Sequence, residues 1–168
     1  MDYEIHLRRI LVPTDFSEYA EHAFLHAATI ARWSGAELVV IHVVEKFMDH
    51  SLLYSDVWPF QKPVQDYYRD LEEQTAGRLT ETVRESVGPD VRFRVIVTNG
   101  RPSFEIAAAA QANEVDMIVI ATHGRGGLAK ALLGSTTERV LRKAECPVLV
   151  MRAGEEGFLH PKQPEGSD

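Results

Sequence analysis

Residues 38–44 read Leu-Val-Val-Ile-His-Val-Val, a run that is apolar at almost every position. An extended strand of this composition is apolar on both faces, which is typical of the interior of a parallel sheet. Residues 117–121, Met-Ile-Val-Ile-Ala, repeat the pattern later in the chain. The two runs therefore predict two central strands, around which the other elements can be placed.

Three other runs predict further strands, at residues 10–12, 91–97 and 147–151. Apolar and charged residues alternate in the second of these, which indicates a half-buried strand at an edge of the sheet. Stretches of helical period separate the strands and begin near Ser17, Val64, Pro102 and Gly134. This alternation predicts an α/β fold of one domain, with a five-stranded parallel sheet, helices on both faces and right-handed crossovers.

The composition limits the partners that the chain can have. Among its 168 residues, 18 Lys and Arg stand against 25 Asp and Glu, so the formal net charge is −7. An acidic chain without a basic cluster lacks the electrostatic basis for binding nucleic acid or a membrane surface, and neither partner is expected. No apolar run approaches the ~20 residues that cross a bilayer, and the N-terminal residues do not resemble a secretory signal. We expect a cytoplasmic protein with a folded domain over residues 1–153 and a mobile tail over residues 154–168.

The loop after the predicted strand 117–121 is rich in glycine. Residues 123–127 read His-Gly-Arg-Gly-Gly, and Gly134 stands where the next helix is predicted to begin. Glycine lets backbone N–H groups approach an anion, and a helix N-terminus favours phosphate, so this loop is a candidate phosphate cradle. A structural role is also open for Ser135, because residues 135–138, Ser-Thr-Thr-Glu, have the spacing of a capping box. The glycine spacing excludes both a P-loop and a dinucleotide-binding fingerprint.

With these motifs the chain resembles the universal stress protein family over residues 8–152. The family signature G-x-x-G-x9-G-[ST] corresponds to Ala121, Gly124 and Gly134-Ser135, with alanine in the first place. The segments Pro13-Thr14-Asp15-Phe16-Ser17, His42-Val43 and Val97-x-x-Gly100-x-Pro102 also follow the family pattern. The resemblance implies a flavodoxin-like sheet of strand order 3-2-1-4-5, a homodimer, and binding of ATP, with AMP and ADP left open.

The resemblance also implies roles for individual residues. Asp15 would hold the adenosine end through its carboxylate, and Val43 would meet the adenine edge through its main chain. Gly124 would let the backbone pass near ribose and phosphate, while Gly134 and its neighbours would donate to the β and γ phosphates. Mg or Mn would be held through the phosphates, without a dedicated protein ligand. The full set of implied binding residues is Pro13, Thr14, Asp15, Val43, Ala121, His123, Gly124, Arg125, Gly134, Ser135 and Thr136.

For the other histidines and the cysteine, the sequence favours a structural role over metal binding or catalysis. His22 and His26 have metal-capable spacing but lack a third ligand, so we interpret them as partly exposed helix histidines. His42 is interpreted as a satisfied core histidine, and Cys146 as an inert buried thiol. Residues 147–152 would leave an apolar edge strand unpaired, and pairing with a second copy would remove that hazard.

Three functions follow as hypotheses. The first is an ATP-binding stress or signalling homodimer with at most slow hydrolysis, in which nucleotide biases residues 45–63 and so the choice of an unknown protein partner. The second is an enzyme acting on a small adenylated or phosphorylated substrate, with His123 and Asp15 as its catalytic candidates. The third is a structural or interaction dimer that functions without nucleotide.

Overall fold

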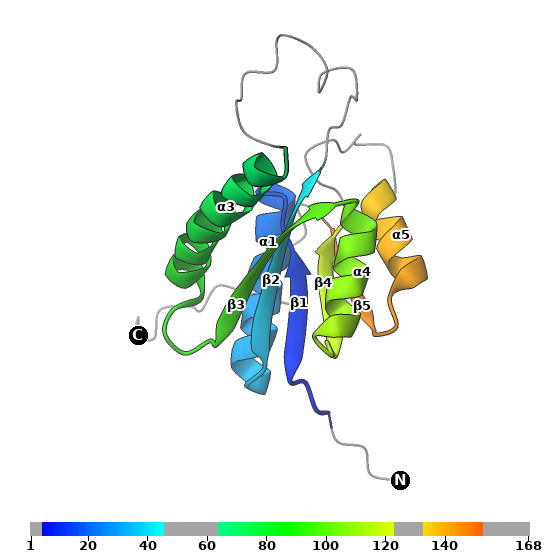
Figure 1. The fold of residues 1–168 in the computed structure, drawn as a ribbon. Helices are drawn as coiled ribbons and strands as arrows, with labels where there is room; N and C mark the ends of the chain where they lie inside the picture. The colour runs from blue at the N-terminus through cyan, green and yellow to red at the C-terminus, as the bar shows by residue number, and fades with distance from the viewer. Residues whose placement is uncertain (1–4, 46–63, 123–132, 153–168) are drawn as a thin grey trace.

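The structure is a computed structural model that describes residues 5–45, 64–122 and 133–152. Within these ranges the chain alternates strands and helices (Figure 1). In chain order the elements are β1 Arg9–Pro13, α1 Glu18–Ser34, β2 Glu37–Glu45, α3 Val64–Val87, β3 Phe93–Gly100, α4 Pro102–Ala112, β4 Met117–Ala121, α5 Ser135–Lys143 and β5 Val148–Met151. The predicted tail, residues 154–168, lies outside the described residues.

The strands form one parallel sheet in the order β3-β2-β1-β4-β5. This arrangement confirms both the fold class and the strand order that the family resemblance implies. The two apolar runs are interior strands, since β2 lies between β3 and β1 and β4 lies between β1 and β5. At one edge, β3 is half-buried along its whole length, as its alternating sequence predicts.

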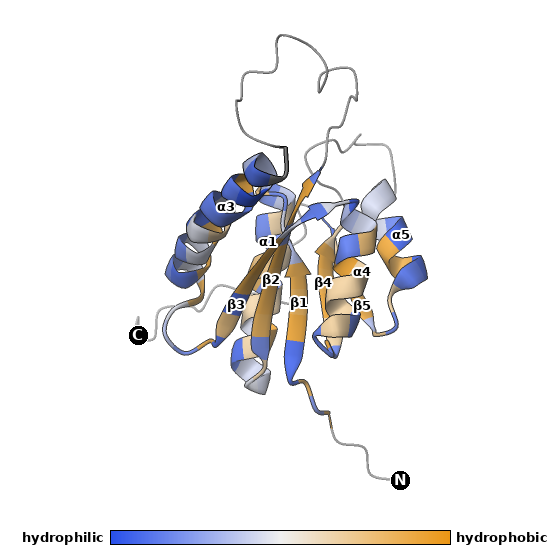
Figure 2. Cartoon of the chain, viewed as in Figure 1, coloured by the Kyte–Doolittle hydropathy of each residue, from blue (hydrophilic) through white to orange (hydrophobic). Residues whose placement is uncertain are grey.

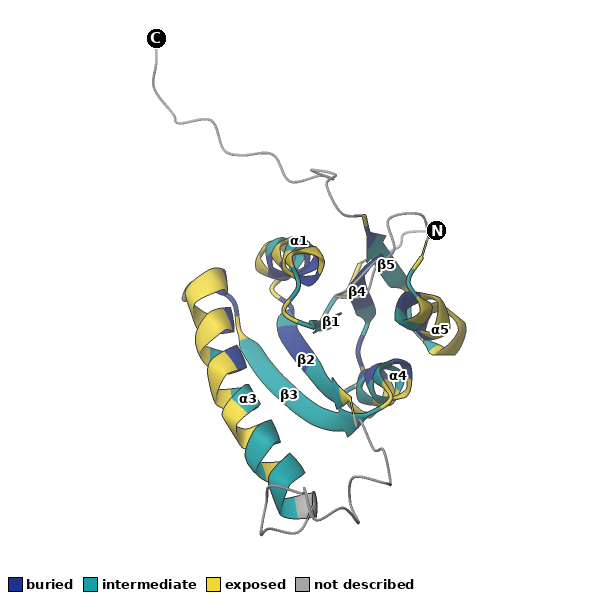
Figure 3. Cartoon of the chain, turned by 90° about the horizontal axis from the view of Figure 1, so that it is seen from above, coloured by how far each residue is buried: buried dark blue, intermediate teal, exposed yellow. Residues whose placement is uncertain are grey.

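Helices cover both faces of the sheet, with α1 and α3 on one face and α4 and α5 on the other (Figure 3). Successive side chains of β2 point to opposite faces of the sheet, so they pack alternately against the two helix layers. Leu38 and Val40 pack with α1 in one core cluster, and Val39 and Ile41 pack with Ile106 of α4 in the other. Both faces of the central strands are therefore apolar (Figure 2).

Local sequence sets the ends of α1. Ser17 is its N-cap, and the Ser17 hydroxyl accepts a hydrogen bond from the Ala20 N–H at 3.2 Å. Gly35 ends the helix with φ of 74°, a left-handed conformation that glycine adopts without steric cost. The interpretation of the helix histidines is wrong for His26, whose side chain is buried at 1% exposure, with Nδ1 2.9 Å from the His22 carbonyl oxygen.

A carboxylate joins the amino ends of the strands. Asp116, just before β4, accepts hydrogen bonds from the backbone N–H groups of Arg8 and Arg9 at 2.7 and 2.9 Å. Burial raises the pKa of the Asp116 carboxyl. The two amides and the Arg8 guanidinium together lower this pKa by more than burial raises it, so the net shift is downward. None of the helices in the described ranges is long and apolar enough to span a membrane.

Candidate functional site

The strand order reverses between β1 and β4, and in open α/β sheets a ligand crevice lies at the carboxyl ends of the strands at such a point. Three of the predicted segments meet at this end of the sheet. They are the turn after β1, the last residues of β2, and the junction between β4 and α5. The elements therefore bring together parts of the chain that are more than a hundred residues apart.

Two hydrogen bonds of the Thr14 backbone connect the turn after β1 to β2. Its N–H donates to the Ile41 carbonyl at 2.8 Å, and its carbonyl oxygen lies 2.8 Å from Nδ1 of His42. Because a carbonyl only accepts, the His42 Nδ1 must carry the proton in this contact. His42 is half-buried and has a polar partner, so its role as a satisfied histidine fits the structure, and it also positions the turn.

Asp15 is held in orientation by the start of α1. Its Oδ1 accepts from the N–H of Ser17 at 3.1 Å and from the Ser17 hydroxyl at 2.5 Å. Between them, Phe16 has φ of 62°, in the left-handed region that non-glycine residues seldom occupy, and its ring centroid lies 4.7 Å from that of His42. Such backbone strain is found preferentially at functional sites. The carboxylate is thus fixed at the carboxyl end of β1, where the resemblance places adenosine.

The main chain of Val43 faces the β1 side of β2. At β2, the Glu37 N–H donates to Arg8 and the Ile41 carbonyl accepts from Thr14, both on the β1 side, whereas the Leu38 N–H donates toward β3. A parallel strand alternates its bonding side with each residue, so Val43 faces the same way as Ile41. The registered pairs between β1 and β2 end at Pro13 and Ile41. The Val43 N–H and C=O are therefore directed toward the crevice, as recognition of an adenine edge requires.

Two hydrogen bonds join the end of β4 to the start of α5, and a third joins it to β5. The Thr122 N–H donates to the Met151 carbonyl at 2.8 Å, and the Gly134 N–H donates to the Thr122 carbonyl at 2.7 Å. The buried Thr137 hydroxyl donates to the Ala121 carbonyl at 2.8 Å. These contacts place the first turn of α5 directly beside the end of β4.

The capping-box interpretation of Ser135 is wrong. Gly134 is the N-cap of α5, with φ of −69° and ψ of 150°, and no side chain caps the helix. Ser135 is the first helical residue and is exposed, and Thr136 is half-buried. The first N–H groups of a helix lack intrahelical acceptors and carry its positive dipole end, so this turn can hold an anion.

Three of the predicted site residues, His123, Gly124 and Arg125, lie outside the described residues. Those that are described, namely Pro13, Thr14, Asp15, Val43, Ala121, Gly134, Ser135 and Thr136, belong to the segments at the carboxyl edge. Two supporting residues were missed as such, His42 and Thr137. In the sequence, His42 could have been noticed as a polar residue in an apolar strand, and Thr137 as a threonine in the first turn of a helix.

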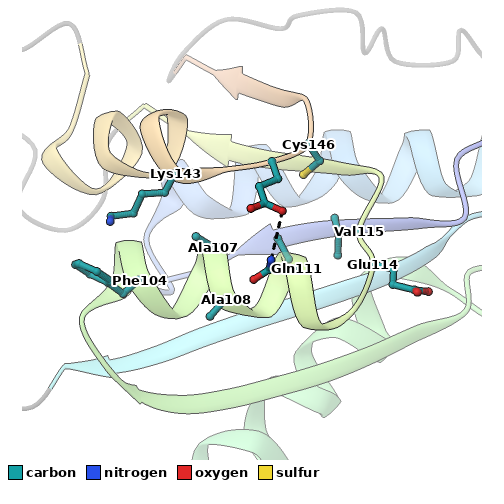
Figure 4. A pocket seen from close by; sticks show the side chains of 10 residues that line it. Phe104, Ala107, Ala108, Gln111, Glu114, Val115, Lys143 and Cys146 are labelled. Carbon is teal, nitrogen blue, oxygen red and sulfur yellow. Dashed lines mark hydrogen bonds between the residues drawn. The ribbon is translucent and has the colours of Figure 1, made fainter.

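The described residues offer no group of three His, Cys, Asp or Glu side chains that could bind a metal ion. A groove of about 540 Å³ lies elsewhere, between α4 and α5 (Figure 4). Phe104 lies at one end under Lys143, whose Nζ is 3.8 Å from the ring centroid, and alanines of α4 form its floor. Burial raises the pKa of the Cys146 thiol in its wall, which agrees with an inert cysteine.

Comparisons with known proteins place the chain in a family. The model of the universal stress protein family matches residues 6–152. Universal stress protein MJ0577 of Methanocaldococcus jannaschii is 34% identical over 154 residues, which cover 86% of this chain and 94% of that protein. The structure of universal stress protein UspA from Lactobacillus plantarum has a TM-score of 0.69 at 28% identity and covers 89% of this chain and 100% of that one.

A further solved relative, the universal stress protein from Archaeoglobus fulgidus in complex with dAMP, has the same fold. Its TM-score is 0.56 at 20% identity, and the match covers 87% of this chain and 98% of that one. The family pattern thus extends from before β1 to the residue after β5. The chain belongs to the universal stress protein family.

Proposed function

We propose that the chain binds ATP at the carboxyl edge of its sheet and acts as a nucleotide-responsive stress or signalling homodimer in the cytoplasm. One observation carries the proposal. The Asp15 carboxylate, the main chain of Val43 and the first turn of α5 meet at the point where the strand order reverses. The dAMP complex of the Archaeoglobus fulgidus relative supports an adenine nucleotide as the ligand.

The residues present fit ATP chemically. A carboxylate accepts hydrogen bonds from ribose hydroxyls or from the adenine amine, and a main-chain N–H and C=O pair suits the adenine edge. Gly134, Ser135 and Thr136 would donate to the phosphates through the helix N-terminus. Mg²⁺ or Mn²⁺ would bind through the phosphate oxygens, which are the hard oxygen ligands that such ions prefer. We expect hydrolysis to be slow at most.

The homodimer is proposed to form through residues 147–152. β5 is an end strand of the described sheet, and its registered partner is β4 on one side. An apolar edge strand exposes backbone N–H and C=O groups that pair readily with another strand. Pairing with β5 of a second copy would satisfy them.

The decisive experiment uses the purified chain. Acid release followed by mass spectrometry identifies any retained nucleotide, and calorimetric titration of ATP into the emptied protein measures affinity. Gly134→Val should abolish binding, because a side chain there blocks backbone approach to phosphate. Gly77→Val is the matched control, since Gly77 is exposed on α3 and a Cβ there meets no atom within 4 Å. Absence of released nucleotide and of rebinding at millimolar ATP would favour the nucleotide-independent dimer.

A further inference from the structure

The groove between α4 and α5 extends toward the amino ends of the strands, away from the proposed nucleotide site. Val115 and Cys146 in its wall stand just before β4 and β5, whereas the nucleotide segments follow the carboxyl ends of strands. Glu114 at this end is already paired with Arg9, at 3.1 Å. The volume of about 540 Å³ is in the range of sites that hold ligands, so the groove has room for an occupant of its own.

One face of α4 forms the floor of the groove. Its side chains follow the i, i+3, i+4, i+7 spacing of a single helix face, namely Phe104, Ala107, Ala108 and Gln111. The two alanines lie between the amide of Gln111 and the ring of Phe104, which is 50% exposed (Figure 4). Because alanine is small, this floor leaves space for larger apolar side chains from a partner.

Two opposite charges lie over this floor. The Nζ of Lys143 is 3.8 Å from the ring centroid of Phe104, and the Glu145 carboxylate accepts one long hydrogen bond, from the Gln111 amide at 3.4 Å. Within the described ranges, neither Lys143 nor Glu145 forms an ion pair. Phe104 and Gln111 are two helical turns apart on α4, so the two charges are separated by about 10 Å along the groove.

We propose that this groove docks an amphipathic helix of a partner protein, with an acidic side chain at Lys143, large apolar side chains over the alanines and a basic side chain at Glu145. These groups occupy positions i, i+3, i+4 and i+7 of the docked helix, because two turns span the ~10 Å between the charges. Docking of an amphipathic helix in a groove is a recurring mode of recognition. The basic group replaces the Gln111 amide at the carboxylate, and a charged donor forms the stronger hydrogen bond.

The test uses a stapled helical peptide that carries Glu, Leu, Leu and Arg at these four positions, with a fluorophore on its opposite face. Fluorescence anisotropy measures its affinity for the full chain. Glu145→Lys replaces attraction by repulsion at an exposed position and should weaken binding about fivefold. A second peptide, with Glu in place of Arg, should bind this variant more tightly than it binds the unchanged chain. The matched control is Glu81→Lys, which changes the net charge equally at an exposed position of α3, on the other face of the sheet.

Two further variants test the apolar contacts. Phe104→Ala removes an exposed aromatic side chain of the kind that dominates interface energies, and should weaken peptide binding roughly tenfold. Ala107→Arg fills the floor and should abolish binding. Circular dichroism checks that each variant is folded.

The single cysteine reports where the peptide binds. Cys146 lies in the groove wall, so the bound peptide should slow its reaction with a thiol reagent. The proposal would be overturned by absence of saturable binding, by equal effects of Glu145→Lys and Glu81→Lys, or by binding that leaves the reactivity of Cys146 unchanged. Protection of Cys146 that rises with protein concentration in the absence of peptide would also overturn it, and would assign the groove to a second copy.

Discussion

Nδ1 of His42 lies 2.8 Å from the carbonyl oxygen of Thr14, so a side chain of β2 holds the turn that presents Asp15. The contact joins residues 28 positions apart in sequence. It fixes the protonated ring nitrogen, and it sets the path of the backbone at the carboxyl end of β1. The geometry of the proposed adenosine site therefore depends on a residue that need not touch the nucleotide.

Replacing His42 tests this dependence. His42→Phe keeps a ring but loses the donor, and the loss of about 1 kcal/mol should raise the Kd for ATP roughly fivefold. His42→Asn places an amide nitrogen near the position of Nδ1 and should largely restore affinity. Calorimetric titration of both variants measures the difference. Equal affinities would show that the contact does not position the site.

Two serines at helix starts should respond differently to alanine. Ser17→Ala removes the N-cap of α1 and should lower the free energy of unfolding by about 1 kcal/mol. Ser135→Ala should leave stability unchanged, because Gly134 caps α5 without a side chain, but should weaken ATP binding. Urea unfolding and ATP titration of each variant separate the two effects. A stability loss for Ser135→Ala would restore the capping-box interpretation.

Thr137 anchors α5 to β4. Thr137→Val keeps the shape of the buried side chain but leaves the Ala121 carbonyl without its donor, so we expect a loss of roughly 1–3 kcal/mol in the free energy of unfolding. Thr137→Ser retains the hydroxyl and is the matched control. Urea unfolding of both variants provides the measurement, and a loss for Thr137→Val no larger than that for Thr137→Ser would contradict an anchoring role for the hydroxyl.

Asp116 should make stability depend on pH in the acid range. Its pKa is lower in the folded protein, so its stabilising contribution is complete above the unfolded value of about 3.9 and is lost as pH falls through the folded pKa. Asp116→Asn should lower stability near neutral pH and flatten this acid dependence. Glu114→Gln is the control, since that exposed ion pair with Arg9 contributes little. Urea unfolding between pH 2.5 and 7 compares the three proteins.

Much of the fold was predictable because its signals are local. The apolar runs at 38–44 and 117–121 identified the interior strands, and the period of residues 64–87 predicted α3 at its observed bounds. Strand boundaries were less accurate, since 91–97 became Phe93–Gly100. The end of that strand depends on pairing with β2 as far as Gly100, which is a tertiary contact that no local pattern contains.

The candidate site residues could be proposed from the sequence, but their contacts could not. The resemblance nominated Asp15, Val43 and Ser135 as binding residues, because glycines and short motifs mark their positions in the chain, and their binding roles stay predictions. The roles of His42 and Thr137 depend on partners across the sheet, and single-sequence patterns do not specify them. Ser135 shows the opposite error, in which a correct local motif is overridden because the chain enters α5 through Gly134.

Thr122 forms hydrogen bonds to both the proposed nucleotide site and the strand proposed to form the dimer. Its N–H donates to Met151, on the strand that would pair with a second copy, and its carbonyl accepts from Gly134, at the start of the proposed phosphate-binding turn. A ligand that shifts Gly134 would thus act on the end of β5 through one residue. Thermodynamic reciprocity then requires that dimer assembly alter nucleotide affinity by the same factor by which nucleotide alters assembly. With positive coupling, these two hydrogen bonds of Thr122 would make this family member a coincidence detector, responding fully only when nucleotide and its own concentration rise together.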